Sequence, residues 1–209
     1  MSIIVIGGHS RSVGKTSVVA GLIGALSEFA WTAVKITQYG HGVCSANGAP
    51  CDCATDDHSC AISEERDLHG NSDTSRFLQA GAARSLWVRT EQGRLAEAMP
   101  PLRRKIADAD HVIIESNSVL RFLRPDLYLT VLDRGTEDFK TSAQEFMDRA
   151  DAVILHEKCE EREPRWKQVS LRPVAGRPRF FIRPPQYVTD DIVQFVRGKL
   201  SAVRASRQA

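Results

Sequence analysis

The sequence predicts a three-layer α/β fold with a mostly parallel central sheet and helices on both faces. Strand-like apolar segments alternate with segments of helical spacing along the whole chain, which is the pattern of a parallel sheet. The segment His111–Glu115 is almost continuously apolar, as is typical of a strand buried on both faces. With 209 residues, 42% of them hydrophobic, the chain can bury one substantial core, so we expect a single domain over residues 1–209.

In the first half of the chain, the elements follow from periodicity and residue type. Ser2 to Gly8 is an apolar run that ends in two glycines, and the apolar residues after Lys15 recur at helical spacing. Because proline lacks an N–H and clashes with the preceding turn, we expect Pro100-Pro101 to interrupt or restart its helix. The prediction is a strand at 2–8, a helix at 15–28, a strand at 31–36, a helix at 73–80, a strand at 84–89 and helical spacing through Leu95, Met99, Leu102 and Ile106.

The second half continues the alternation. Ser142 to Glu145 reads as a capping box that starts a helix reaching about Arg149, and Thr189 is placed to cap a final amphipathic helix. We predict strands at 111–115, 127–132, 152–155 and 179–182, a polar loop at 157–177, and a last helix through Ile192, Val193, Val196, Leu200 and Val203.

The turn between the first strand and the first helix carries the strongest chemical signal. It reads His9-Ser10-Arg11-Ser12-Val13-Gly14-Lys15-Thr16-Ser17, which delivers Gly-Lys-Thr to a helix start, as in a phosphate-binding loop. In this pattern backbone N–H groups hold phosphate oxygens, the lysine neutralises them, and the threonine hydroxyl holds Mg²⁺. The residues predicted to bind the nucleotide are Ser12, Val13, Gly14, Lys15, Thr16 and Ser17.

The spacing of this loop departs from the usual G-x4-G-K-[ST]. His9 stands where the first glycine is expected and Gly8 lies one residue too early, which gives G-x5-G-K-T. This longer loop resembles that of dethiobiotin synthetase and the cobyrinic acid amide synthases. The predicted fold is therefore that of a P-loop NTPase.

Three charged residues at other predicted strand and helix ends are candidates for the same site, because strand ends carry the ligand in this fold class. Glu115 ends an apolar strand as a Walker B carboxylate does, and we assign it to Mg²⁺ together with Thr16. Lys35 lies near the end of the second strand, where it either stabilises a transferred phosphoryl group or is a surface lysine. Asp73 begins a helix and either binds Mg²⁺ or serves as an N-terminal helix acid. The candidate catalytic residues are Lys15, Lys35, Asp73 and Glu115.

The order of these motifs resembles the molybdopterin-guanine dinucleotide biosynthesis protein B family. The resemblance covers roughly the first 130 residues and is carried by the phosphate loop, Val34-Lys35-Ile36-Thr37 with His41, Ser72-Asp73-Thr74-Ser75-Arg76 leading into Gln79-Ala80-Gly81-Ala82, and Ile113-Ile114-Glu115. It implies a GTP-binding protein, usually a homodimer, that assists attachment of the nucleotide to the molybdenum cofactor.

Two departures keep a second assignment open. The longer phosphate loop, and Ser116-Asn117-Ser118 where the family has a glycine after its strand-end Glu, both favour a dethiobiotin-synthetase-like, ATP-dependent enzyme. The base is open as well: guanine is commonly read by Asn-Lys-x-Asp, whereas this chain has Glu157-Lys158-Cys159-Glu160. The nucleotide is GTP or ATP, and the second substrate is a small molecule or cofactor precursor.

A cysteine-rich insertion is expected at about 38–70. Loops of this length in a compact domain usually function or are held by a ligand. Cys44, Cys51, Cys53 and Cys60 match the number of ligands of a tetrahedral Zn²⁺ site; an iron–sulfur cluster is the less favoured alternative, and free thiols are the third. A bound metal would favour another class of function, a nucleotide-gated metal-handling or adaptor protein.

The charge balance excludes bulk electrostatic binding. The chain has 28 Lys and Arg against 26 Asp and Glu, a net charge of +2, so we expect neither nucleic acid nor a membrane surface as a partner. The first residues enter a strand without a signal-type segment, and no apolar run is long enough to span a bilayer. We expect a cytoplasmic protein.

Overall fold

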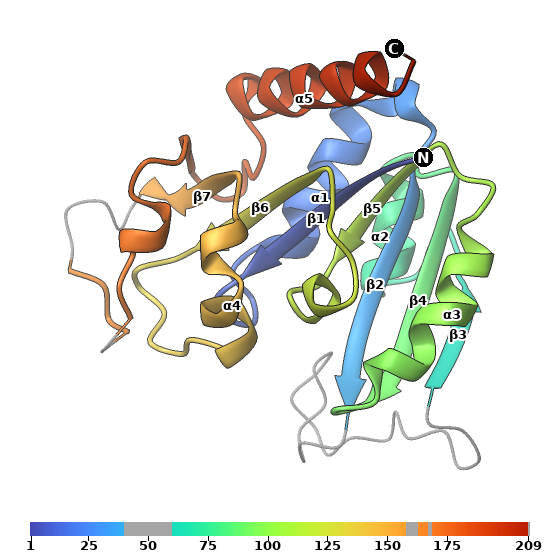
Figure 1. Cartoon of the computed structure of the whole chain (residues 1–209), viewed down its shortest axis with the longest axis horizontal. Coiled ribbons are helices and arrows are strands. Elements are labelled where there is room, and N and C mark those ends of the chain that lie inside the picture. Colours follow the sequence, from blue (N-terminus) through green and yellow to red (C-terminus); the bar gives the residue numbers. More distant parts are fainter. Residues whose placement is uncertain (40–59, 158–162, 167–168, 209) are drawn as a thin grey trace.

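The structure is a computed structural model that describes residues 1–39, 60–157, 163–166 and 169–208. Its sheet has eight strands in the order β3-β4-β2-β5-β1-β6-β7-β8 (Figure 1). Neighbouring strands are parallel except at one edge, where β3 is antiparallel to β4. The strands are β1 (Ser2–Gly8), β2 (Thr32–Tyr39), β3 (Cys60–Glu64), β4 (Arg84–Glu91), β5 (His111–Glu115), β6 (Leu127–Leu132), β7 (Ala152–His156) and β8 (Arg179–Ile182).

Helices cover both faces of this sheet and enclose two apolar layers. On one face, α1 (Lys15–Ala25), α2 (Asp73–Gln79) and α5 (Asp190–Gln208) bury side chains such as Leu22, Phe77 and Val196. On the other face, α3 (Leu95–Lys105) and α4 (Thr141–Glu145) frame a second layer that includes Leu102 and Phe146. Short 3-10 turns complete the chain at η1 (Ser27–Phe29), η2 (Ser118–Arg121), η3 (Met147–Arg149) and η5 (Arg172–Val174). The predicted three-layer α/β fold is confirmed.

Several element boundaries differ from the prediction. The first helix ends at Ala25 instead of Glu28, because Leu26 leaves the helical conformation and its carbonyl accepts a hydrogen bond of 2.8 Å from the Trp31 indole. The second strand continues to Tyr39, so Lys35 lies in its middle and not near its end. The predicted loop at 38–70 contains a strand, β3, whose pairing with β4 is a long-range contact that local sequence does not reveal.

Two helix predictions were also wrong in detail. Pro100-Pro101 does not interrupt α3, which runs through both prolines because Met99 and Leu102 on either side are buried against the sheet. Ser142 does not cap α4. The helix begins at Thr141 without a side-chain cap, and Lys140 at the N-cap position donates its backbone N–H to the His9 carbonyl at 2.7 Å. Tertiary contacts therefore decide these two helix details.

Candidate functional site

The loop between β1 and α1 presents its backbone N–H groups to one concave side. Ser12 (φ 55°) and Gly14 (φ 89°) both adopt the left-handed conformation, which turns successive N–H groups in the same direction. Among the described residues, none accepts a hydrogen bond from the backbone N–H groups of Ser12 to Ser17. Together with the helix N-terminus, these donors can receive an anion.

Gly14 is required by its surroundings as well as by its backbone. A Cβ atom at this position would lie 2.3 Å from Cε1 of Tyr187, so the tyrosine ring closes one side of the loop. The Tyr187 ring also packs edge-on against His156, whose Nε2 lies 3.0 Å from the Val13 carbonyl oxygen. His156 at the end of β7 and Tyr187 on the segment after β8 thus fix the second half of the loop.

Lys15 is folded back onto the loop. Its Nζ donates to the Ser10 carbonyl at 2.5 Å. Burial lowers the pKa of Lys15 to about 8, against the opposing attraction of the Glu115 carboxylate. A phosphate group beside this ammonium would supply a full negative charge in place of one carbonyl dipole, and would favour the protonated form.

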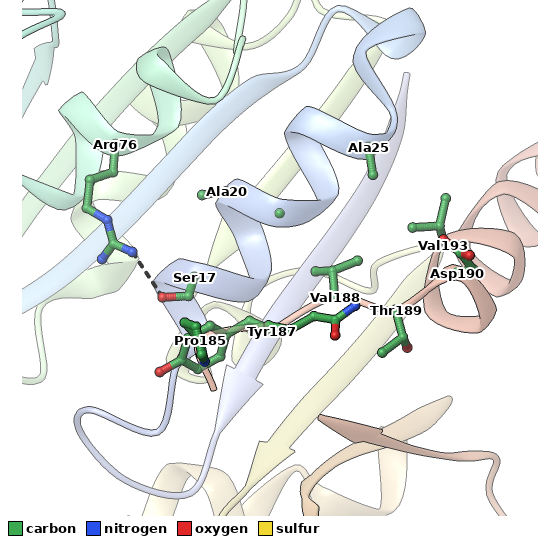
Figure 2. Close-up of a pocket in the computed structure, with 12 residues that line it drawn as sticks. Ser17, Ala20, Ala25, Arg76, Pro185, Tyr187, Val188, Thr189, Asp190 and Val193 are labelled. Atoms are coloured by element: carbon green, nitrogen blue, oxygen red, sulfur yellow. Dashed lines mark hydrogen bonds between the residues drawn. The ribbon is translucent and has the colours of Figure 1, made fainter. Parts of the chain in front are cut away.

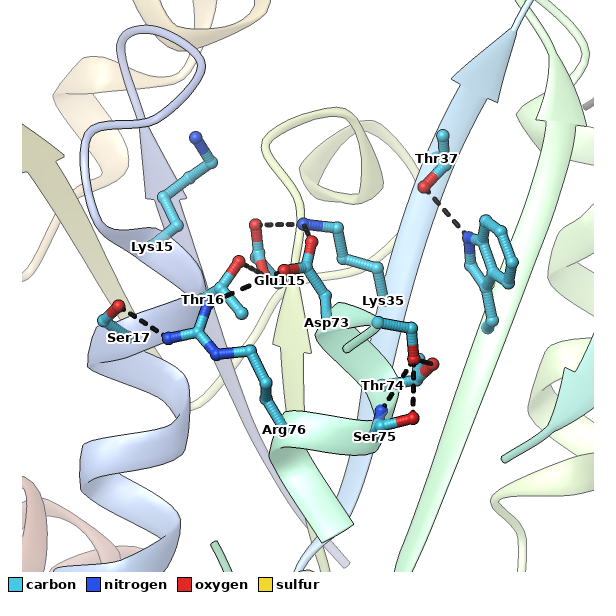
Figure 3. Close-up of polar contacts among 12 residues, drawn as sticks. Lys15, Thr16, Ser17, Lys35, Thr37, Asp73, Thr74, Ser75, Arg76 and Glu115 are labelled. Carbon is cyan, nitrogen blue, oxygen red and sulfur yellow. Dashed lines mark hydrogen bonds and ion pairs between the residues drawn. The ribbon is translucent and has the colours of Figure 1, made fainter. Parts of the chain in front are cut away.

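Four polar side chains from four elements meet at the foot of the loop (Figure 3). Thr16 at the start of α1 donates to Glu115 Oε2 at 2.8 Å, and its hydroxyl is close enough to the Asp73 carboxylate to help lower the pKa of that group. The Lys35 ammonium lies 2.5 Å from Glu115 Oε1 and 2.7 Å from Asp73 Oδ2. The β2–β5 register places Lys35 directly beside Glu115, so Lys35 reaches the site although its strand continues past it.

The charges in this cluster support one another. The Glu115 side chain is 3% exposed, that of Lys35 18% and that of Asp73 39%. Burial alone would lower the pKa of Lys35, but the Glu115 and Asp73 carboxylates outweigh it and raise the pKa above its usual value. Burial likewise opposes ionisation of Asp73, and the Lys35 charge overcomes this and lowers the pKa of the carboxyl group.

Asp73 is positioned by the cap of α2. Ser72 is the N-cap residue, and its Oγ accepts from the Ser75 N–H at 2.9 Å. The Glu65 carboxylate accepts hydrogen bonds from Ser72 Oγ at 2.9 Å and Thr74 Oγ1 at 2.8 Å. Backbone donation from Asp67, followed by these hydroxyls, lowers the pKa of Glu65 to about 2. The start of α2, with Asp73 in its first turn, is therefore held by several hydrogen bonds.

A groove of about 570 Å³ runs along α1 beside the loop (Figure 2). Ser17 and Arg76 close one end, where Arg76 Nη2 donates to Ser17 Oγ at 2.9 Å. Tyr187 and Val188, on the segment that leads into α5, form its long wall. The groove starts at the last residue of the predicted phosphate loop.

The first half of the loop is anchored by His9, a role that the sequence does not reveal. The His9 ring has no exposed surface; its Nδ1 lies 2.8 Å from the Asp138 carbonyl oxygen, and its Nε2 accepts from the Asp133 N–H at 3.0 Å. It also contacts the rings of Phe139 and Trp166, with centroids 5.0 and 4.8 Å away. His9 therefore ties the phosphate loop to the segment after β6.

Three further residues of the site were missed by sequence reasoning. The Asn117 side chain pairs with both backbone groups of Gly8, at 2.9 and 2.8 Å, and so fixes the end of β1. Asp138 accepts from Ser10 Oγ at 2.7 Å. Lys140 is half-buried beside His9, and burial together with the nearby Arg11 charge lowers the pKa of its ammonium. Only Asn117 gave a signal, because it belongs to the Ser116-Asn117-Ser118 segment that departs from the glycine expected after Glu115.

The donor set of the cluster suits Mg²⁺. Thr16 offers a hydroxyl oxygen, and Glu115 and Asp73 offer carboxylates, which are the hard oxygen ligands that Mg²⁺ prefers.

The predicted cysteine site lies mostly outside the described residues. Cys44, Cys51 and Cys53 lie outside the described residues, and Cys60 is a free, half-buried thiol at the start of β3, on the α3 face of the sheet. Among the described residues, no group of three His, Cys, Asp or Glu side chains could hold a metal ion.

No protein-family model matches the chain, and no curated protein matches it in sequence. Solved structures do. HypB from Helicobacter pylori in complex with nickel is 15% identical with a TM-score of 0.50, over 95% of this chain and 87% of HypB. LpxK from Aquifex aeolicus in complex with ATP is 18% identical with a TM-score of 0.47, over 87% of this chain and 53% of LpxK, so the chain spans about half its length. A MobB homolog from Bacillus stearothermophilus is 14% identical with a TM-score of 0.46, over 97% of this chain and 99% of that protein.

The likeness to HypB shows that the chain has the fold of the P-loop NTPases, and at this identity it shows the fold alone. None of the helices in the described ranges is both long enough and apolar enough to cross a membrane.

Proposed function

We propose that this chain is a Mg²⁺-dependent P-loop NTPase that binds a purine nucleoside triphosphate and acts on a second, small substrate. The proposal rests on one observation: an anion-binding loop and a group of oxygen ligands lie next to each other at the carboxyl edge of the sheet. The unpaired N–H groups of Ser12 to Ser17 form an anion site, and the Thr16, Glu115 and Asp73 oxygens lie at its foot. A polyphosphate and a divalent cation need these two features side by side.

Each residue of the site has a distinct role in this proposal. The backbone amides and the Lys15 ammonium hold the β- and γ-phosphate oxygens, and Ser17 lies next along the chain toward the groove. Thr16 and Glu115 hold Mg²⁺, with Asp73 as a further oxygen ligand. When bound, the ion neutralises charge on the phosphate oxygens. Lys35 faces the terminal phosphate or the acceptor. Catalysis then consists of positioning and charge neutralisation.

The nucleoside is best accommodated in the groove along α1. Its wall is formed by the segment after β8, which places the Tyr187 ring beside Gly14 and offers an aromatic surface for a base. The residues after Glu157 lie outside the described residues, so support for guanine or adenine comes from the sequence alone. The motif order favours GTP and a step in molybdenum-cofactor or related cofactor biosynthesis, and the longer phosphate loop favours ATP.

Isothermal titration calorimetry with non-hydrolysable GTP and ATP analogues tests the proposal and chooses between the two bases. We expect one analogue to bind in the micromolar range with Mg²⁺ and to weaken at least tenfold when Mg²⁺ is chelated. Absence of binding by both analogues at millimolar concentration would refute the proposed function. The matched control is Lys105→Ala, an exposed lysine on α3 that lies outside the site and should leave affinity unchanged.

A further inference from the structure

Lys35 occupies the position in which a cation is needed between two carboxylates. Its ammonium lies within 2.7 Å of an oxygen of both Glu115 and Asp73 (Figure 3). Both carboxylates also reach the Thr16 hydroxyl. The two carboxylates that suit Mg²⁺ thus already share one cation of the chain itself.

Two carboxylates so close together repel each other unless a cation lies between them. Glu115 is almost fully buried, so the cost of leaving it unpaired is high. An ammonium on a flexible four-carbon stem meets this need and can also leave, because its bonds are point-like and not bidentate. A divalent cation bound by the same oxygens would have to replace it.

We propose that Lys35 is an exchangeable internal cation: it holds Glu115 and Asp73 together in the nucleotide-free protein and yields them to a divalent cation when nucleotide binds. This inference rests on the proposed function and adds that the divalent cation replaces Lys35 only when nucleotide binds. Lys35, once displaced, carries its charge to the nearest anion, which is the terminal phosphate or an anionic acceptor.

The surrounding charges explain why the exchange needs nucleotide. Lys15 and Lys140 both lie close enough to Lys35 for its charge to lower their pKa values. A displaced Lys35 ammonium would therefore face like charges, and a bound polyphosphate removes this repulsion. A divalent cation and a nucleotide should accordingly bind with positive cooperativity, and the metal alone should bind weakly.

The test is Mn²⁺ binding to the nucleotide-free protein, measured by electron paramagnetic resonance of the free ion. In Lys35→Met the competing charge is gone, so we expect Mn²⁺ to bind at least tenfold more tightly than in the wild type. Lys35→Arg keeps the charge and should bind as weakly as the wild type, and so should the exposed-site control Lys105→Met. Adding Glu115→Gln to Lys35→Met should remove the gain, which assigns it to this carboxylate pair.

Equal Mn²⁺ affinity in wild type and Lys35→Met would overturn the inference, and so would a gain that survives Glu115→Gln. If Lys35→Met does not fold, Lys35→Gln, which keeps an N–H donor without the charge, makes the same comparison. Analogue binding by the wild type, measured on the same preparation, separates the two proposals. If the wild type binds nucleotide but Lys35→Met binds Mn²⁺ no more tightly than the wild type, the exchange is refuted and the proposed nucleotide site is not.

Discussion

Replacement of His9 tests how the phosphate loop is anchored. The ring is fully buried, and two hydrogen bonds join it to the segment after β6, to Asp138 and to Asp133. His9→Phe keeps an aromatic ring of similar size and removes both of these partly buried hydrogen bonds, to the Asp138 carbonyl and from the Asp133 N–H. At about 1–1.5 kcal/mol for each bond, we expect the free energy of unfolding to fall by about 2–3 kcal/mol.

His9→Ala should cost more, because it also removes the ring contacts with Phe139 and Trp166. With about 0.5–1.5 kcal/mol for each of the two ring pairs, the total loss is about 3–6 kcal/mol. For a chain of this size this corresponds to a melting temperature lower by roughly 6–24 °C. Urea unfolding measures both variants, with His69→Ala, an exposed histidine, as the control.

The pH dependence gives an independent check. Burial lowers the pKa of His9 from 6.5, so the unfolded chain takes up a proton below pH 6.5 that the folded protein resists. The wild type therefore loses stability as pH falls below 6.5, and His9→Phe lacks this loss. The difference between the two proteins should shrink in acid. A loss of less than 1 kcal/mol in His9→Ala at neutral pH, or a difference that grows in acid, would refute this account of the loop.

Three further predictions follow from other parts of the molecule. Gly14→Ala places a side chain in the left-handed region and against the Tyr187 ring, so nucleotide affinity measured by calorimetry should drop at least tenfold. Adding Tyr187→Ala to Gly14→Ala should restore only part of the affinity, because the backbone strain remains. Full nucleotide affinity in Gly14→Ala would contradict this geometry. The backbone hydrogen bond from Asp67 is the chief cause that lowers the pKa of Glu65 to about 2. The ionised Glu65 carboxylate therefore stabilises the fold above pH 4.5, and this stabilisation is lost as pH falls toward 2. Glu65→Gln should flatten this part of the acid unfolding curve, and an unchanged curve would show that Glu65 does not stabilise the start of α2. If Cys60 shares a metal with Cys44, Cys51 and Cys53, protein purified without chelator should carry zinc, and Cys60→Ser should lower the zinc content. Metal-free wild-type protein would end that hypothesis.

The parts of the site that the sequence predicts are those that local pattern and strand topology determine. Gly14-Lys15-Thr16 is a local motif, and Glu115 ends an apolar strand, so both could be placed at the carboxyl edge of a parallel sheet. Asp73 could be placed at a helix start. The sequence does not show which of these side chains contact one another. Lys35 reaches Glu115 from the middle of β2 because the register of two strands, 80 residues apart, sets them side by side.

The parts that could not be predicted depend on contacts between distant segments. His9 looked like a replacement for a glycine, and its hydrogen bonds join it to residues 124 and 129 positions away. Tyr187 closes the loop from the far end of the chain. The helix through Pro100-Pro101 continues because buried neighbours outweigh the local cost of proline. In each case tertiary packing overrides the local signal.

Nucleotide binding by Lys15→Ala tests the central claim most directly. The claim is that the amides and the ammonium at the start of α1 hold a polyphosphate, so calorimetry with the non-hydrolysable analogue that the wild type prefers should show no measurable binding in Lys15→Ala. Circular dichroism should confirm that the variant is folded. Micromolar affinity retained by a folded Lys15→Ala protein would contradict the account.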